Sequence, residues 1–150
     1  MTPYECAADV VKFLKGKLEI KESGQIYVGF LPRIDKAKDS RKRCPSIAVR
    51  AADVDDEKDG STARILIYVL TYDEDMMYGS QSLSHILEKI RYEILANNPV
   101  SDEWWLELGN GGMHSSVPDE QPFPYWWGVI EMIVAIPRPQ NNKWINQYTR

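Results

Sequence analysis

Two acidic runs are the residues of this chain whose type and spacing could do chemistry. Five acids lie between residues 53 and 59, directly before Gly60, and residues 73–75 read Asp-Glu-Asp after a long apolar stretch. Carboxylate oxygens are the usual ligands of calcium and magnesium, and a carboxylate at a strand end can act as a general base. Each run therefore predicts a site only if the rest of its ligand set is present.

Part of the first run matches the calcium-binding loop of an EF-hand. Asp55, Glu57, Asp59 and Gly60 fall at its first, third, fifth and sixth positions. The twelfth position needs a bidentate glutamate and holds Leu66, within an apolar stretch. The sequence therefore favours a solvated acidic turn here over a calcium site.

The second run lies just ahead of a predicted helix, where carboxylates also favour the positive end of the helix dipole. No histidine or cysteine lies close in sequence to either run, and there is no Gly-x-Ser-x-Gly motif beside His85 or His114. The Gly-rich residues 109–112 lack the Lys-Ser/Thr ending of a phosphate-binding loop. We therefore expect no catalytic residue, metal or cofactor. The alternative left open is a small metal-dependent hydrolase using Asp73, Glu74, Asp75 and His85.

Composition restricts the class of protein. The 150 residues suit one domain, here residues 1–139, with a mostly polar C-terminal stretch, 140–150, ordered against a partner. A net charge of −4 opposes general or sequence-specific nucleic-acid binding, which needs a basic surface. Two cysteines, no signal-peptide pattern and no apolar run of membrane-spanning length predict a cytoplasmic chain without membrane contact.

Charge is nevertheless unevenly distributed. Residues 33–43 carry six Lys or Arg side chains and almost nothing apolar, which predicts a solvated loop. Exposed ion pairs within one chain contribute little stability, whereas complementary patches on two copies set register and partner choice. We therefore expect the basic segment 33–43 and the acidic segment 53–59 to lie on opposite sides of a subunit and to meet between neighbouring subunits. The candidate contact residues are Arg41, Lys42, Arg43, Asp55, Asp56 and Glu57.

Two Trp pairs are the remaining candidates for contact. Residues 104–105 and 126–127 are both Trp-Trp, and neighbouring residues of a strand point to opposite faces. One Trp of each pair is therefore expected to pack inward and the other to face outward, where Trp is common in interface hot spots. Trp105, Trp126, Asp73 and Asp75 complete the candidate interface, with ordinary packing as the alternative for the tryptophans.

Periodicity predicts the elements that must position these residues. Helical spacing covers about 3–18, capped by Thr2 with Glu5, and 80–97, where an Asn of the Asn-Asn-Pro at 97–99 could take a left-handed cap. Strands are predicted at 26–30, 45–50, 65–72, 104–108 and 129–136, with 65–72 central and 53–59 a connection. This order predicts an α+β fold: an antiparallel or mixed sheet of about four to five strands with two main helices on one face.

Several of these segments resemble the tail terminator (tail completion) proteins of long-tailed bacteriophages and prophages. The likeness covers most of residues 3–139. It comprises the capped first helix, Cys-Pro-Ser-Ile at 44–47, Leu-Thr-Tyr-Asp-Glu-Asp at 70–75, the loop and helix at 79–95, the Asn-Pro stop at 98–99, Pro-Phe-Pro-Tyr-Trp-Trp-Gly at 122–128, and the Ile-Pro ending at 136–137.

The resemblance implies a subunit that assembles as a homo-oligomeric ring, typically a hexamer, on the last ring of tail-tube subunits. Such a ring stops tube growth and presents a surface to the head–tail connector. It implies action by contact without enzyme chemistry, in the host cytoplasm during assembly and then in the tail–neck region of the virion. Another neck or head–tail connector protein is the alternative within the same structural class.

Overall fold

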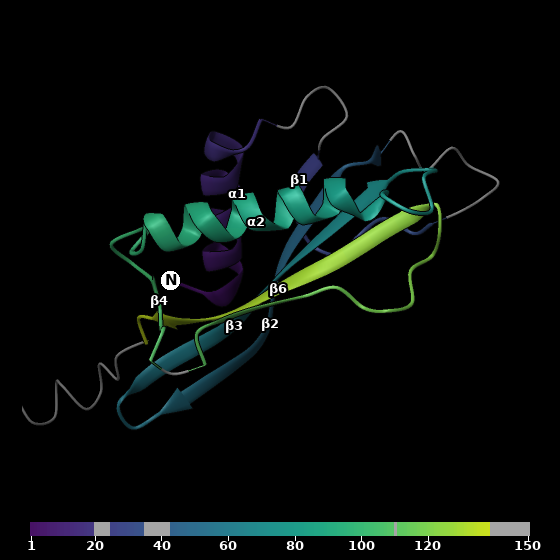
Figure 1. Ribbon diagram of the computed structural model, residues 1–150. Helices are drawn as coiled ribbons and strands as arrows, with labels where there is room; N and C mark the ends of the chain where they lie inside the picture. Colours follow the sequence, from purple (N-terminus) through teal and green to yellow (C-terminus); the bar gives the residue numbers. More distant parts are fainter. Residues whose placement is uncertain (20–24, 35–42, 110, 139–150) are drawn as a thin grey trace, which may run out of the picture.

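The computed structural model describes residues 1–19, 25–34, 43–109 and 111–138. Two helices lie on one side of a six-stranded sheet (Figure 1). This arrangement confirms the predicted α+β class. The elements are α1 (Pro3–Lys17), β1 (Gln25–Val28), β2 (Ser46–Glu57), β3 (Gly60–Tyr72), α2 (Ser80–Ala96), β4 (Trp105–Leu106), β5 (Met113–Ser116) and β6 (Tyr125–Ile136).

The sheet is mixed and is centred on β3. Its order is β1-β2-β3-β6-β4, and β5 pairs with the same outer edge of β6 as β4 does. β1 runs parallel to β2, and all the other paired strands are antiparallel. β3 is paired along almost its whole length on both edges, which confirms the prediction that residues 65–72 form a central strand.

Local signals define both helices. The Thr2 hydroxyl accepts from the Glu5 amide at 3.1 Å, and the Thr2 amide donates to the Glu5 carboxylate at 2.8 Å, so the predicted capping box is present. α2 ends at Ala96, close to its predicted end, and its C-cap Asn97 has a φ of −113°, outside the left-handed region. Asn97 donates its side-chain amide to the Glu93 carbonyl at 2.8 Å, at the end of the helix.

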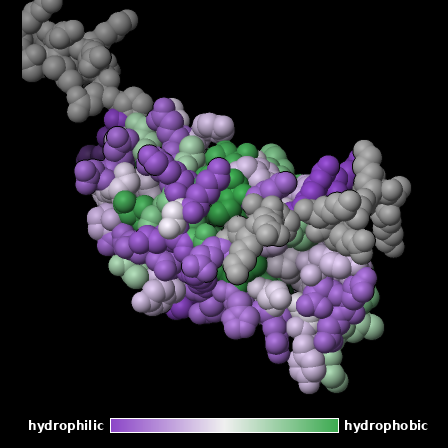
Figure 2. Space-filling view, turned by 90° about the horizontal axis from the view of Figure 1, so that it is seen from above, coloured by the Kyte–Doolittle hydropathy of each residue, from purple (hydrophilic) through white to green (hydrophobic). Residues whose placement is uncertain are grey.

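The main core lies between the helices and one face of the sheet. Alternate strand residues point into it: Ile47 and Val49 from β2, Ile65 and Ile67 from β3, and Ile130 and Met132 from β6. Both helices contribute to this same cluster: Cys6, Ala7, Val10, Val11 and Leu14 from α1, and Leu83, Leu87, Ile90 and Ile94 from α2. From above, apolar residues gather near the middle of an otherwise largely hydrophilic surface (Figure 2).

Several strand boundaries differ from those predicted, and one strand was not predicted. Residues 53–57 continue β2 and are not a connection, because they pair with β3 from Asp53–Arg64 to Glu57–Gly60. β4 is only two residues long, and β6 begins at Tyr125 instead of residue 129 because its first residues pair with the end of β3. β5 was not predicted, since its residues are mostly polar and exposed. None of the described helices has the length and apolar character needed to cross a membrane.

Ile90 provides a test of the core. Its side chain is fully buried on α2, so Ile90→Ala should lower the free energy of unfolding by about 2–5 kcal/mol. Urea denaturation measures the change, and Lys89→Ala on the exposed side of the same helix is the control. A loss below about 1 kcal/mol would show that this face of α2 is not packed.

The two cysteines provide a second test. Burial raises the pKa of the Cys6 thiol to about 12, with a contribution from the charge of Asp9, and burial raises the pKa of Cys44 to about 11. Both thiols are therefore protonated and covered near pH 8, and the thiolate is the reactive form. We expect Ellman's reagent to label neither cysteine rapidly in the folded protein and both in guanidinium. Rapid labelling of the folded protein would contradict the burial of the labelled thiol.

Candidate functional site on the uncovered face and one end of the sheet

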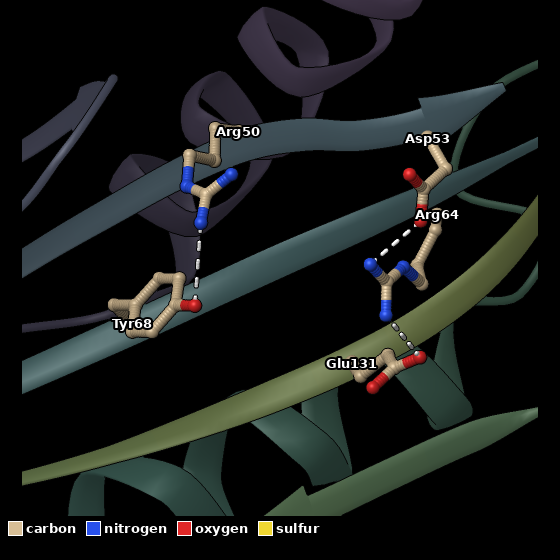
Figure 3. Close-up of polar contacts among 5 residues, drawn as sticks. All are labelled: Arg50, Asp53, Arg64, Tyr68 and Glu131. Atoms are coloured by element: carbon tan, nitrogen blue, oxygen red, sulfur yellow. Dashed lines mark hydrogen bonds and ion pairs between the residues drawn. The ribbon is translucent and has the colours of Figure 1, made fainter.

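The face of the sheet opposite the helices carries a row of charged and aromatic residues. Arg50 and Asp53 come from β2, Arg64 and Tyr68 from β3, and Glu131 from β6 (Figure 3). Strand alternation places them there, because the intervening residues point into the helix-covered core. Four of these five side chains are partly exposed and Asp53 is exposed.

Arg64 connects three strands across this face. Its guanidinium lies 2.6 Å from an Asp53 carboxylate oxygen and 3.2 Å from a Glu131 oxygen (Figure 3). The hydrogen bond that Arg64 donates to Glu131 and the charges of Asp53 and Glu131 raise the arginine pKa, against an opposing effect of desolvation. A cation already matched by two carboxylates fixes the strands relative to one another and offers no proton for catalysis.

Arg50 lies in a different, aromatic environment. Its guanidinium carbon is 4.6 Å from the centroid of the Phe30 ring and 5.4 Å from that of Tyr68, both cation–π distances. Tyr68 in turn stacks on Trp127 at 6.0 Å between ring centroids. One guanidinium nitrogen lies 3.4 Å from the Tyr68 hydroxyl, whereas Nε is buried with no hydrogen-bond partner among the described residues (Figure 3).

A pocket of about 470 Å³ opens beside Arg50. We call it the Arg50 pocket. Its walls are largely apolar, and among the described residues that line it Arg50 is the one that carries a charge. Its walls include Phe30, Leu31, Ile34, Arg50, Tyr68 and Trp127.

A second exposed apolar feature lies where β3 ends. Met76, Met77 and Tyr78 are consecutive, and their exposed fractions are 77%, 78% and 58%. We call residues 73–78 the Met loop. Three consecutive large apolar side chains this exposed form an apolar patch on the surface.

The acids predicted as candidates hold this loop in shape. Asp73 Oδ1 accepts from the Asp75 amide at 2.9 Å, and Asp75 Oδ1 accepts from the amides of Met77 and Tyr78 at 2.9 and 3.0 Å. These are the local side-chain-to-backbone bonds that aspartate forms in turns. Asp73 and Asp75 therefore act on the loop conformation, while Glu74 accepts from the Tyr72 hydroxyl.

Trp126 anchors the base of the Met loop. Its indole nitrogen donates to the Asp73 carbonyl at 3.0 Å, and its ring packs against the core on the helix side. A Cβ on Gly79 would lie 2.4 Å from the Asp75 carbonyl oxygen and 2.7 Å from that indole nitrogen, so the loop needs glycine there. Of the pair, Trp126 faces the helix-covered side and Trp127 the uncovered side.

The other candidate residues lie elsewhere. Trp104 is fully buried, whereas Trp105 is 45% exposed and donates its indole N–H to Glu107 at 2.9 Å, so this pair divides inward and outward as expected. Asp55, Asp56 and Glu57 are exposed on the end of the β2–β3 hairpin (Figure 1).

The basic candidates lie at the other end of β2. Arg43 is exposed just before that strand, whereas Asp55–Glu57 are at its far end. Arg43 is therefore well separated within one chain from residues Asp55–Glu57, which we call the acidic arm. Arg41 and Lys42, like residues 140–150, lie outside the described residues.

The described residues give the hydrolase alternative no cluster of metal ligands. Among the described residues, no three His, Cys, Asp or Glu side chains are gathered in a way that could hold a metal ion. His85 is exposed on α2 and His114 on β5.

Sequence reasoning missed the Met loop and the Arg50 pocket. The signal for the loop was present, since Met76, Met77 and Tyr78 interrupt a polar segment between a strand and a helix. The pocket had no local signal. Phe30, Arg50, Tyr68 and Trp127 come from four separate parts of the chain and meet only through strand pairing.

Two glycines offer a matched test of the loop geometry. Gly79→Ala should lower the free energy of unfolding by about 1–3 kcal/mol, because the new methyl group overlaps backbone and indole atoms. Gly16→Ala in α1 meets nothing within 4 Å and should raise stability by about 0.5–1 kcal/mol through helix propensity. Thermal denaturation of both variants measures the difference. Equal effects would show that Gly79 does not approach Trp126 closely.

No protein-family model matches this chain, and no curated protein matches it. Among solved structures, one chain of a "Virion of native gene transfer agent (GTA) particle" is similar, with a TM-score of 0.41 and 11% sequence identity. That likeness covers 93% of this chain and 100% of the other.

Proposed function

We propose that this chain is a non-enzymatic structural protein of a phage or prophage virion: a tail terminator that caps the tail tube as a homo-oligomeric ring and forms the head–tail joining surface. Its partners are further copies of itself, typically six in the family it resembles, the tail-tube protein and the head–tail connector. It acts in the host cytoplasm during assembly and remains in the tail–neck region of the virion.

The observation that carries this proposal is the separation of unlike surfaces on one subunit. The acidic arm, Asp55–Glu57, and the basic Arg43 lie at opposite ends of β2. A head-to-tail contact brings one surface of each subunit against the other surface of its neighbour, and such contacts close into rings. The motif resemblance at residues 44–47, 70–75 and 122–128 supports a position for this ring at the end of the tail tube.

The chemistry of the candidate residues supports action by contact. The carboxylates of Asp73 and Asp75 are used to shape a loop, and Arg64 is matched by two acids. What remains exposed is apolar, aromatic or charged surface of the kind that partners bind.

Assembly should depend on salt and on the sign of the acidic arm. Raising salt from about 0.05 to 0.5 M shortens the screening length from more than about 10 Å to about 4 Å, so the ring should weaken. Replacing Asp55, Asp56 and Glu57 with Lys should block assembly, and a matching reversal of residues 41–43 to Glu should partly restore it. Light scattering after size exclusion measures the species.

The control for charge reversal is the exposed pair Asp119 and Glu120, which lies away from the acidic arm in the loop before β6. Replacing both with Lys should leave the ring intact. Assembly indifferent to salt and to both reversals would show that these charges only solvate the chain.

The specific role is tested by electron microscopy of phage lysates. Without this protein, we expect tail tubes of uncontrolled length that are not joined to heads, and a supplied wild-type copy should restore them. Tubes of normal length that still fail to join heads would instead assign the chain to another neck position. A metal-dependent hydrolytic activity lost in Asp73→Asn/Asp75→Asn would overturn the structural role.

A further inference from the structure

We propose that the Met loop of one copy docks into the Arg50 pocket of a second copy, with its methionines against the aromatic walls and Glu74 facing Arg50. This inference rests on the proposed homo-oligomer and names the contact that forms it. Both surfaces belong to one chain, so every copy would supply a loop to one neighbour and a pocket to the other.

The pocket has the chemistry of a receptor for an apolar side chain beside an acid. Phe30, Tyr68 and Trp127 present aromatic rings, and Leu31 and Ile34 add aliphatic surface. Arg50 lies against this surface with its Nε buried and without a hydrogen-bond partner among the described residues. A carboxylate that arrives in the pocket would pair with the outer guanidinium nitrogens, in a charge-assisted hydrogen bond stronger than the 3.4 Å contact of one of them with the Tyr68 hydroxyl.

The Met loop has the complementary chemistry. Methionine sulfur makes favourable contacts with aromatic rings, and its flexible side chain adapts to an irregular pocket. Asp73 and Asp75 already accept backbone N–H groups, so Glu74, bonded to the Tyr72 hydroxyl, is the acid best placed to turn to a new partner. The three apolar side chains and this acid therefore match the pocket in both apolar character and charge.

The loop is also shaped before it binds. The bonds from Asp73 and Asp75, the indole of Trp126 and the close packing at Gly79 hold its backbone. A preformed loop loses less conformational entropy when it docks.

The contact must be made between copies. Met76 and Met77 are more than three-quarters exposed within one chain, so they do not fill that chain's own pocket. The pocket is on the uncovered face of the sheet, whereas the loop extends past the end of β3. Because the two surfaces differ, the contact is head-to-tail and can propagate around a ring.

Disulfide trapping tests the contact directly in the full chain. Phe30→Cys and Met77→Cys are placed together in one chain, where both side chains are 73% or more exposed and substitution should not disturb the fold. Cys6 and Cys44 are buried and contribute little background. Mild oxidation should produce a ladder of covalent dimers and higher oligomers on a non-reducing gel, which the single variants should not produce.

The matched control replaces Met77→Cys with Tyr92→Cys, at an exposed aromatic residue on α2. That pair should give no ladder. If the oligomer forms by light scattering and the Phe30–Met77 pair still gives no ladder, this docking is wrong while the ring itself stands. Both the docking of the Met loop and the ring would be wrong if the chain stays monomeric at all concentrations and on the tail tube.

Charge exchange provides an independent readout. Arg50→Glu and Glu74→Lys should each raise the dissociation constant of the oligomer about tenfold or more, and the double variant should recover part of that loss. Met77→Ser should weaken assembly similarly, whereas Tyr92→Ser should not. Equal behaviour of Met77→Ser and Tyr92→Ser would exclude the Met loop from the contact.

Discussion

The pairing of β3 on both of its edges is the constraint on which the rest of this structure depends. Because side chains alternate along a strand, one register decides at once which residues enter the core and which face outward. In this register Ile65 and Ile67 lie under the helices, while Arg64 and Tyr68 lie on the uncovered face. A slip by one residue would bury the arginine and expose the isoleucines.

The same register assembles surfaces from distant segments. Arg64 reaches Asp53 on one neighbouring strand and Glu131 on the other, and Tyr68 lies between Arg50 and Trp127. Beyond the end of β3, the chain turns through a loop that Trp126 of β6 holds in place. The core thus positions the polar bridge, the pocket and the loop with a single set of strand pairs.

Much of this architecture could be predicted because its signals are local. The capping box at Thr2 and Glu5, the apolar stripe of α2 and the β-branched run of β3 each depend on residues close in sequence. The acidic residues 53–57 misled the prediction because pairing with β3 overrides their low strand propensity. The short β4 and polar β5 exist only as partners of β6, so nothing within their own residues could set their bounds.

The candidate site was less predictable for the same reason. Asp73, Asp75 and Trp126 were identified from their types. The two aspartates shape the Met loop through local bonds, whereas Trp126 reaches the Asp73 carbonyl only because β6 pairs with the end of β3. The Arg50 pocket depends on segments far apart in sequence. Residue type indicated which side chains matter, and only strand pairing determined what each one does.

The outer edge of β2 has a consequence for how copies of this chain avoid aggregation. β1 covers the outer edge of β2 only from Ser46 to Val49. Among the described residues, no strand therefore pairs with Ala51 to Glu57 on this outer edge, although β3 pairs with them on the inner edge. Unpaired strand edges recruit other strands and seed aggregates, and repeated negative charge is one way in which proteins prevent this. Two such acidic edges repel each other. The acidic arm thereby opposes indiscriminate edge-to-edge pairing of two copies of this chain.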